Sequence, residues 1–272
     1  MDIEYLLFLQ NFRNSIHDVL TPLIKLSACV YRPWIRDSRI LPAGDSVTTA
    51  TGYSFPSGHT TTAGPLAGGT AVGTWENKRT RFISFILVLF ILLTGFSRNY
   101  LGVHTPQDVF VAILLTVMSL VLTALLFRYL EEHPEKENWF LCGALVLSVA
   151  GLIYITFKPY PMDYNAEGKL IVDPQKMMND GYGDIGKMIG FILARFVEKN
   201  WIRFKPLKKS VLNIGICLLG LIPMVLLKKF VNPLIVAWLG SHWGKLVFSV
   251  IYVCYYLALF PIVLKMIDRK QR

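Results

Sequence analysis

The chain alternates between long apolar blocks and short polar segments. Five blocks contain almost no charged residues, at 82–96, 109–127, 139–157, 211–227 and 246–264. Each is 15 to 19 residues long, close to the roughly 20 residues that a helix needs to cross the hydrocarbon core of a bilayer. Five such blocks in one chain favour an integral membrane protein over a soluble protein with buried core helices.

Two further segments are expected to span the membrane despite their weaker hydrophobicity. Residues 60–75 are rich in Gly, Ala and Thr, the small residues that let membrane helices pack closely. Residues 185–201 are largely apolar, although Lys187, Arg195 and Glu198 interrupt them. Together with the five blocks, they predict an all-α, polytopic membrane helical bundle with about seven spans.

The polar segments predict how this one membrane domain is organised. Residues 1–24 contain Arg13, His17 and Asp18 among apolar positions, which predicts an amphipathic helix on the membrane surface. Residues 25–57 and 158–183 are polar and rich in turn-forming residues, and both predict loops in water. We expect an amphipathic segment at 1–24, a motif-bearing core at 25–130 and additional transmembrane helices at 131–272.

The net charge of +10 is better explained by membrane orientation than by nucleic-acid binding, because the chain lacks a basic domain with interleaved aromatic residues. If the motifs described below face away from the cytoplasm, the cytoplasmic loops carry 14 Lys and Arg residues, against 6 in the opposite loops after residue 157. This bias follows the positive-inside rule. The four scattered cysteines have no CxxC spacing and indicate neither a zinc site nor a disulfide framework. The N-terminus lacks the pattern of a cleavable signal.

Three short motifs in the first 108 residues carry the candidate chemistry. They are Lys25-x6-Arg32-Pro33, Pro56-Ser57-Gly58-His59 and Ser97-Arg98-x5-His104-x3-Asp108. The second motif opens one predicted span, and the third lies between the next two. The predicted topology therefore places both motifs at the same face of the membrane.

The cationic residues of these motifs are typical of a phosphate site. Lys25, Arg32 and Arg98 can hold the non-bridging oxygens of a phosphoryl group. Ser57 and Gly58 precede a predicted helix, where backbone N–H groups and the helix dipole attract an anion. Taken singly, each arginine could instead bind lipid headgroups or set topology, but the neighbouring histidines favour the phosphate site.

The two histidines and the carboxylate can perform the hydrolysis. His104 is the predicted nucleophile, since a neutral imidazole can attack phosphorus and form a phosphohistidine, and Asp108 would orient its ring. An alternative is that Asp108 serves the capping box of a helix that starts at Thr105-Pro106. His59 would protonate the leaving group and later activate water. We expect no metal and no cofactor, because three cations can neutralise the developing charge.

These motifs resemble those of the type 2 phosphatidic acid phosphatase superfamily, which includes vanadium haloperoxidases and bacterial acid phosphatases. Its signatures KxxxxxxRP, PSGH and SRxxxxxHxxxD all occur without substitution across residues 25–108. The resemblance implies metal-free hydrolysis of a lipid phosphate at the extracytoplasmic side of a membrane, typically a bacterial cell membrane. It also implies the roles given above. Membrane members usually place two or three spans before the first motif, whereas here 24 residues precede Lys25 and none is expected to span.

The leading hypothesis is an integral membrane phosphatase for a lipid phosphomonoester or diphosphate, with membrane lipids as its surroundings and no nucleic-acid partner. Phosphatidic acid, phosphatidylglycerol phosphate and a polyprenyl diphosphate are the candidate substrates. An alternative is a catalytically inactive protein that binds or transports a lipid phosphate on the same scaffold. Haloperoxidase chemistry with vanadate is a third hypothesis, which the membrane-embedded character of the chain disfavours.

Overall fold

The computed structural model describes residues 19–50, 52–75, 77–204, 215 and 219–271. In this part of the chain the structure is helical, apart from turns, loops and one isolated bridge between Tyr164 and Leu170. Residues 19–28 form the first described helix. The named elements that follow are α2 (Pro33–Arg36), α3 (Ser46–Thr49), α4 (Gly58–Trp75), α5 (Arg81–Tyr100), α6 (Pro106–Glu132), η1 (Pro134–Lys136), α7 (Glu137–Phe157), α8 (Pro174–Val197), η2 (Glu198–Ile202), α10 (Leu221–Leu226), η3 (Leu227–Val231), α11 (Asn232–Leu239), α12 (Ser241–Cys254), η4 (Tyr255–Leu259) and α13 (Phe260–Gln271).

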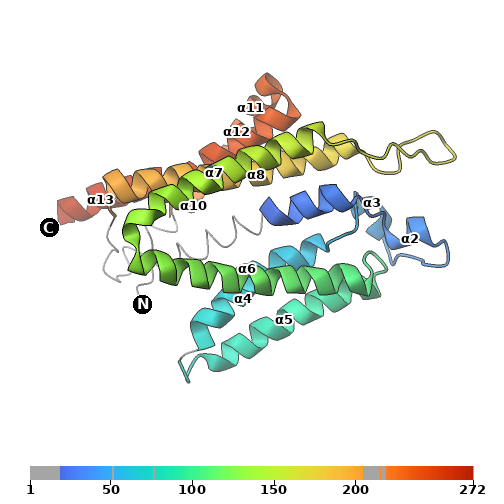
Figure 1. Cartoon of the computed structure of the whole chain (residues 1–272), viewed down its shortest axis with the longest axis horizontal. Coiled ribbons are helices and arrows are strands. Elements are labelled where there is room, and N and C mark those ends of the chain that lie inside the picture. Colours follow the sequence, from blue (N-terminus) through green and yellow to red (C-terminus); the bar gives the residue numbers. More distant parts are fainter. Residues whose placement is uncertain (1–18, 51, 76, 205–214, 216–218, 272) are drawn as a thin grey trace.

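The helices form two groups (Figure 1). Helix α4 packs against α5 and α6, while α8 packs against α7 and α12. The helix of residues 19–28 lies between the two groups in Figure 1. Its Leu26 is buried in a cluster with Ile155 of α7 and Tyr182 of α8. Lys25, the first motif residue, therefore lies where the two groups meet.

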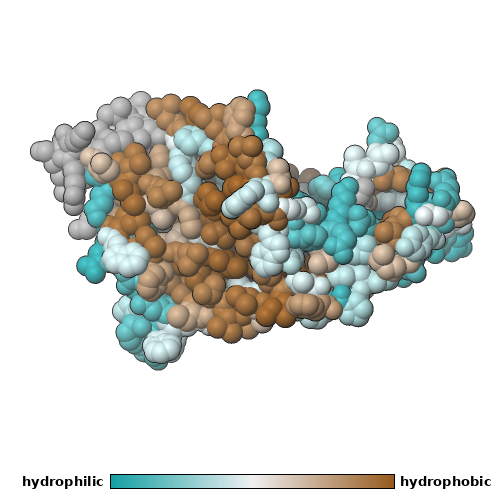
Figure 2. All heavy atoms as spheres, turned by 90° about the horizontal axis from the view of Figure 1, so that it is seen from above, coloured by the Kyte–Doolittle hydropathy of each residue, from teal (hydrophilic) through white to brown (hydrophobic). Residues whose placement is uncertain are grey.

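The prediction of an all-α membrane protein is confirmed. Within the described residues, five helical segments are long and apolar enough to cross a membrane: Arg81–Tyr100, Pro106–Glu132, Pro134–Phe157, Leu221–Leu239 and Ser241–Met266. Helices α4 and α8, both predicted to span, fall outside this set. Figure 2 shows the apolar side chains over the body of the molecule and the polar ones at the end where Figure 1 places α2 and α3.

The start of α8 differs from the sequence-based prediction. Residues 158–183 were expected to form a loop, but α8 begins at Pro174. The Asp173 side chain accepts hydrogen bonds from the backbone N–H groups of Gln175 and Lys176, and proline suits the first helical turn. The loop prediction is wrong for 174–183 because the helix-start signal of Asp173-Pro174 outweighs the polar composition of the segment.

Helix α8 can carry polar residues because it packs tightly and its charges are paired. A Cβ atom at Gly186 would lie 2.5 Å from the carbonyl oxygen of Leu246 in α12. Arg195 Nε lies 2.7 Å from Glu137 Oε1 of α7, and Lys199 Nζ lies 2.9 Å from Glu137 Oε2. Ion pairing of this kind lowers the cost of placing charged residues inside a bundle.

The predicted span at 211–227 lies partly outside the described residues. The described helix runs through α10, η3 and α11, from Leu221 to Leu239, so it includes Lys228 and Lys229, which lie beyond the end of the predicted span. Lysine ammonium groups can extend along a helix toward polar surroundings, so these residues did not have to end the helix. It ends before Gly240, whose φ of +80° is readily adopted by glycine.

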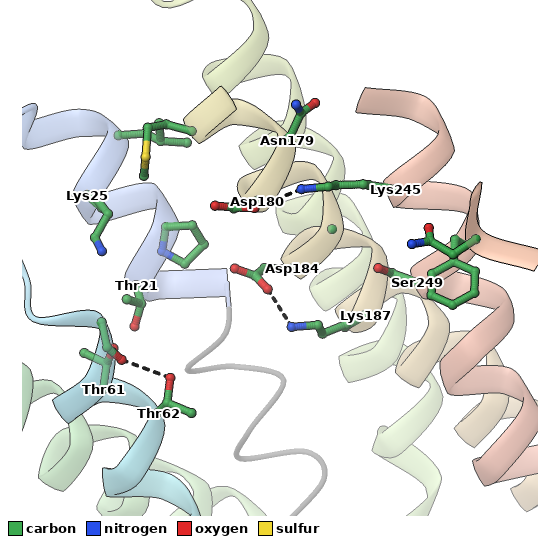
Figure 3. A pocket seen from close by; sticks show the side chains of 17 residues that line it. Thr21, Lys25, Thr61, Thr62, Asn179, Asp180, Asp184, Lys187, Lys245 and Ser249 are labelled. Atoms are coloured by element: carbon green, nitrogen blue, oxygen red, sulfur yellow. Dashed lines mark hydrogen bonds and ion pairs between the residues drawn. The ribbon is translucent and has the colours of Figure 1, made fainter. Parts of the chain in front are cut away.

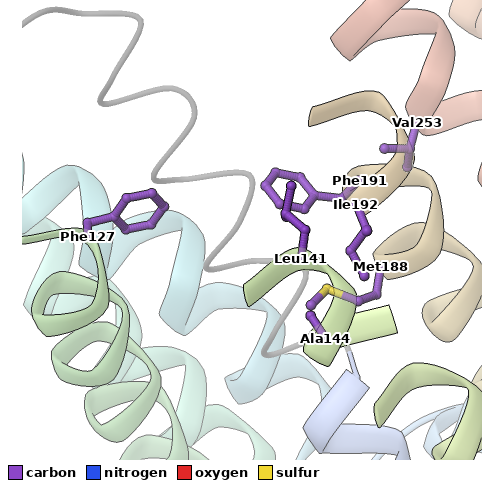
Figure 4. Close-up of a cluster of buried hydrophobic side chains, with 7 residues drawn as sticks. All are labelled: Phe127, Leu141, Ala144, Met188, Phe191, Ile192 and Val253. Carbon is purple, nitrogen blue, oxygen red and sulfur yellow. The ribbon is translucent and has the colours of Figure 1, made fainter. Parts of the chain in front are cut away.

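Buried apolar side chains of both helix groups belong to one cluster, in which Figure 4 shows Phe127 on one side and the other six on the other. Phe127 of α6 belongs to a cluster with residues of α7, α8 and α12. The other members are Leu141, Ala144, Met188, Phe191, Ile192 and Val253. The helices after residue 132 are thus packed against the part of the chain that carries the motifs. Residues 1–18 of the predicted amphipathic helix at 1–24 lie outside the described residues. The predicted boundary between a motif-bearing core and additional helices at residue 130 stays a prediction.

Candidate functional site

The turn between α5 and α6 fixes the position of His104. Gly102 has a φ of +68°, a conformation in which a side chain is strained. A Cβ atom there would also lie 3.4 Å from the Cα of Pro42. The backbone N–H of Val103 then donates to the carbonyl oxygen of Arg98 at 3.2 Å. His104 follows in this turn with only 4% of its surface exposed.

The contact between His104 and Arg32 defines which ring nitrogen carries the proton. Arg32 Nη1 lies 2.9 Å from His104 Nε2. A guanidinium group has only donors, so Nε2 must be the acceptor and the ring proton must lie on Nδ1. Burial lowers the pKa of His104 to about 4. At neutral pH the ring is therefore uncharged and holds its free electron pair on Nε2.

Asp108 combines the two roles that the sequence left open. Its Oδ2 accepts a hydrogen bond from the backbone N–H of Thr105 at 2.8 Å and completes the capping box of α6. The same oxygen lies 3.5 Å from His104 Nδ1, which is long for a hydrogen bond. Asp108 therefore caps the helix and also faces the protonated ring nitrogen.

Ser54 joins His104 and Asp108, and the sequence-based prediction missed it. Its hydroxyl group donates to Asp108 Oδ2 at 2.5 Å and lies 3.3 Å from His104 Nδ1. The side chain is almost fully buried, with 1% exposed. The available signal was a hydroxyl residue three positions before Ser57 in the same polar segment.

The second motif contacts both of the others. The backbone N–H of Ser57 donates to the carbonyl oxygen of Asp108 at 3.1 Å, and its hydroxyl lies 3.0 Å from Thr60 Oγ1. A Cβ atom at Gly58 would lie 3.3 Å from Lys25 Nζ. The start of α4 is thus placed between Lys25 and the turn that carries His104.

Arg32 and Lys25 remain charged at neutral pH. Arg32 donates to the carbonyl oxygens of Gly52 and Val103, at 3.1 and 2.9 Å. Burial, with a smaller contribution from the positive charge of Arg98, lowers its pKa to about 10. Burial and the charge of Arg32 lower the pKa of Lys25 to about 8. These shifts indicate cations that are mainly buried and also lie near one another, an arrangement found at anion sites.

His59 and Arg98 lie at the edge of this group. His59, in the first turn of α4, is exposed, and the positive charges of Arg98, Arg32 and Lys25 all act on it. Arg98 lies in the last turn of α5, where its Nε lies 3.4 Å from Ser97 Oγ. The structure therefore brings the eight predicted site residues into one region. Arg32, Ser57, His104 and Asp108 are linked by direct contacts, and the others lie beside them.

The site is formed by cations, hydroxyl groups and imidazoles. Asp108 supplies the carboxylate of the predicted residue set. Among the described residues, His, Cys, Asp and Glu do not gather in groups of three or more that could hold a metal ion. The arrangement can bind a phosphoryl group, attack it with His104 and exchange a proton with what leaves.

Comparisons with known proteins agree with this chemistry. Residues 6–132 match the model of a family described as the PAP2 superfamily. A segment of 76 residues is 41% identical to undecaprenyl-diphosphatase BcrC of Bacillus subtilis (strain 168), which corresponds to 28% of this chain and 35% of that protein. The chain thus matches about a third of the length of this curated relative. No solved structure matches the chain.

Proposed function

We propose that this chain, whose residues 6–132 belong to the PAP2 superfamily, is an integral membrane phosphatase that hydrolyses a lipid phosphomonoester or diphosphate. The similarity to an undecaprenyl-diphosphatase supports a lipid with a terminal phosphoryl group as the substrate. The charge bias of the loops supports a site on the extracytoplasmic side, and the bacterial relative supports a bacterial cell membrane.

The orientation of His104 is the observation that carries this proposal. Its Nε2 faces Arg32 at 2.9 Å, and its Nδ1 faces Ser54 and Asp108 on the other side of the ring. In this orientation the electron pair on Nε2 points toward Arg32, the cation that would hold a phosphate oxygen. A phosphoryl group would take over the hydrogen bond from Arg32 and come within reach of Nε2.

The reaction then proceeds in two displacements. His104 Nε2 attacks phosphorus, the bond from phosphorus to the leaving oxygen breaks, and His59 protonates that oxygen. The phosphoimidazolium that forms is stabilised by the negative charge of Asp108. In the second step, His59 takes a proton from water, the resulting hydroxide attacks phosphorus, and the bond to Nε2 breaks. Inorganic phosphate and neutral His104 are released.

Lys25, Arg32 and Arg98 supply the charge neutralisation that a metal supplies in other phosphatases. We therefore propose that hydrolysis does not depend on a metal ion. The prediction is that activity of the purified protein is unchanged by excess EDTA. Activity that is lost in EDTA and restored by a divalent cation would contradict it.

The first test of the proposed function is phosphate release from lipid phosphates and diphosphates by the detergent-solubilised protein. His104→Ala is expected to lower kcat by about a thousandfold or more, because an essential nucleophile is removed. His133→Ala, in the loop after α6, is the matched control and should retain full activity. Full activity in His104→Ala would exclude the mechanism.

The covalent intermediate can be sought in the His59→Ala variant. Loss of His59 removes the acid of the first step and the base of the second. With a labelled substrate whose leaving group needs no protonation, only the second step is slowed, so phosphorus should accumulate on the protein and disappear when His104 is also replaced. If the wild-type protein binds lipid phosphate or moves it across vesicles without releasing phosphate, the alternative of a catalytically inactive binding or transport protein is the correct one.

A further inference from the structure

A cavity with a volume of about 560 Å³ connects the phosphate site to the second group of helices. Lys25 and Gly58 line one side of it, and residues of α8, α11 and α12 line the other (Figure 3). The family match ends at residue 132, so the far wall lies outside the matched segment. The cavity has room for a group attached directly to a phosphoryl group held at Lys25.

The charges in this wall are paired. Lys245 Nζ lies 3.0 Å from Asp180 Oδ1, and Lys187 Nζ lies 2.7 Å from Asp184 Oδ1. With Lys25, the lining carries three lysines and two aspartates. The pairing leaves little free positive charge for a second phosphate, and the small positive excess disfavours an ammonium group. The balance therefore favours an uncharged ligand.

Several oxygen atoms of the lining have no hydrogen-bond partner. Among the described residues, the buried side-chain atoms without a partner include Thr21 Oγ1, Asn179 Oδ1 and Asn232 Oδ1, and all three residues line the cavity. A buried polar atom without a partner carries a desolvation cost. The amide and hydroxyl oxygens can accept a hydrogen bond, so a ligand donor that reached them would relieve this cost.

We propose that this cavity binds an uncharged, hydroxyl-bearing headgroup that links the phosphoryl group of the substrate to its lipid. This inference rests on the proposed phosphatase function. The hydroxyl groups of such a headgroup can donate hydrogen bonds to the unpartnered oxygens and to the carboxylates of Asp180 and Asp184. Polar and ionisable residues of membrane proteins commonly mark a substrate site, and here they lie beside the proposed phosphate site.

The test compares two lipids that differ in one hydroxyl group. One carries a terminal phosphate on a glycerol headgroup, and the other carries it on propane-1,3-diol. We expect kcat/KM of the wild-type protein to be roughly tenfold or more higher for the glycerol lipid, because a site that hydrogen-bonds a hydroxyl disfavours the analogue that lacks it. A third lipid with a hexose headgroup distinguishes a sugar from a glycerol as the source of the hydroxyl groups.

Asn179→Leu should remove this preference while preserving the fold. Replacing an unpartnered amide by an apolar side chain of similar size relieves its desolvation cost, so the melting temperature should be unchanged or raised. Asn138→Leu is the matched control, because its Oδ1 is also buried without a partner but the residue does not line the cavity. It should keep the wild-type preference.

Two results would overturn the inference and leave the phosphatase function intact. One is equal hydrolysis of the glycerol and propanediol lipids in an activity that His104→Ala abolishes. The other is the same loss of preference in Asn138→Leu as in Asn179→Leu. If Asn179→Leu does not fold, the comparison of lipids on the wild-type protein still decides. Absence of His104-dependent hydrolysis with every lipid would instead refute the phosphatase function.

Discussion

Ser54 is the residue on which the alignment of His104 and Asp108 depends most directly. Its hydroxyl group fills the space between Asp108 Oδ2 and His104 Nδ1, where the direct separation is 3.5 Å. Removing it would leave a buried carboxylate oxygen and the ring N–H less well paired. The same ring could then turn away from the orientation that presents Nε2.

Ser54→Ala is expected to lower kcat by about 10- to 100-fold, since an unsatisfied buried group costs about 1–3 kcal/mol and each 1.36 kcal/mol is tenfold in rate. Steady-state kinetics with a lipid phosphate measure the effect. Ser46→Ala is the control, because its hydroxyl bonds only to Ala43 within its own turn. Equal activity of Ser54→Ala and the wild type would show that Asp108 orients the ring without help.

The pKa values of His104 and Lys25 predict a bell-shaped pH dependence. Burial lowers the pKa of His104 to about 4, so its nucleophilic neutral form is present above that pH. The pKa of Lys25 is lowered to about 8, so its positive charge is lost above that pH. The value of kcat/KM should therefore rise through about pH 4, decline as His59 loses the proton that it donates to the leaving group, and fall further through about pH 8 as Lys25 loses its charge.

The Lys25→Arg variant distinguishes the titration of Lys25 from that of the substrate phosphate, whose second pKa lies near 6. Arginine keeps its charge at higher pH, so the fall above pH 8 should move upward by at least one unit, whatever the overall activity of the variant. An alkaline limb at the same pH in both proteins would assign that titration to a group other than Lys25.

At the scale of elements, the contact of α8 with α12 determines whether the cavity wall forms. This contact is close at Gly186, where a Cβ atom would lie 2.5 Å from the carbonyl oxygen of Leu246. Backbone atoms cannot move aside as the end of a flexible side chain can. A larger side chain at this position must therefore push the two helices apart.

Gly186→Val is expected to destabilise the protein by about 1–3 kcal/mol through overpacking, seen as a lower melting temperature in detergent. Gly183→Ala, three residues earlier on α8, is the matched control. Its added Cβ would meet Ser249 Oγ at 3.6 Å, an ordinary contact, so its melting temperature should be close to that of the wild type. Equal stability of both variants would contradict the packing argument.

At the scale of the whole molecule, the orientation in the membrane can be measured directly. The loop bearing Glu167 connects α7 to α8, while the loop bearing Lys78 connects α4 to α5, and both residues are exposed. If the site faces away from the cytoplasm, Glu167→Cys should react in intact cells with a maleimide that cannot cross the membrane. Lys78→Cys should react only after permeabilisation.

The four native cysteines are first replaced by serine so that only the introduced thiol is labelled. Retained phosphatase activity verifies that this background is folded. The reverse pattern of labelling would place the site on the cytoplasmic side and would show that the loop charges do not set the orientation here.

Local sequence patterns are sufficient for the fold class and for much of the candidate site. Apolar blocks such as 109–127 predict membrane helices because every backbone polar group in a bilayer must be paired within a helix or a closed barrel. The three motifs predict the candidate site because each places its charged or small polar residues close together in the chain, and the catalytic and binding roles stay predictions. Errors occurred where polar composition outweighed a local signal, as at Asp173-Pro174.

Other features required the tertiary structure because they depend on residues far apart in the chain. The proton on His104 Nδ1 follows from a contact with Arg32, 72 positions away, and the role of Ser54 follows from its distance to Asp108, 54 positions away. The cavity joins Lys25 to α8 and α12. No periodicity in a uniformly apolar helix specifies which of its faces meets a partner, so these relations form only when the helices pack.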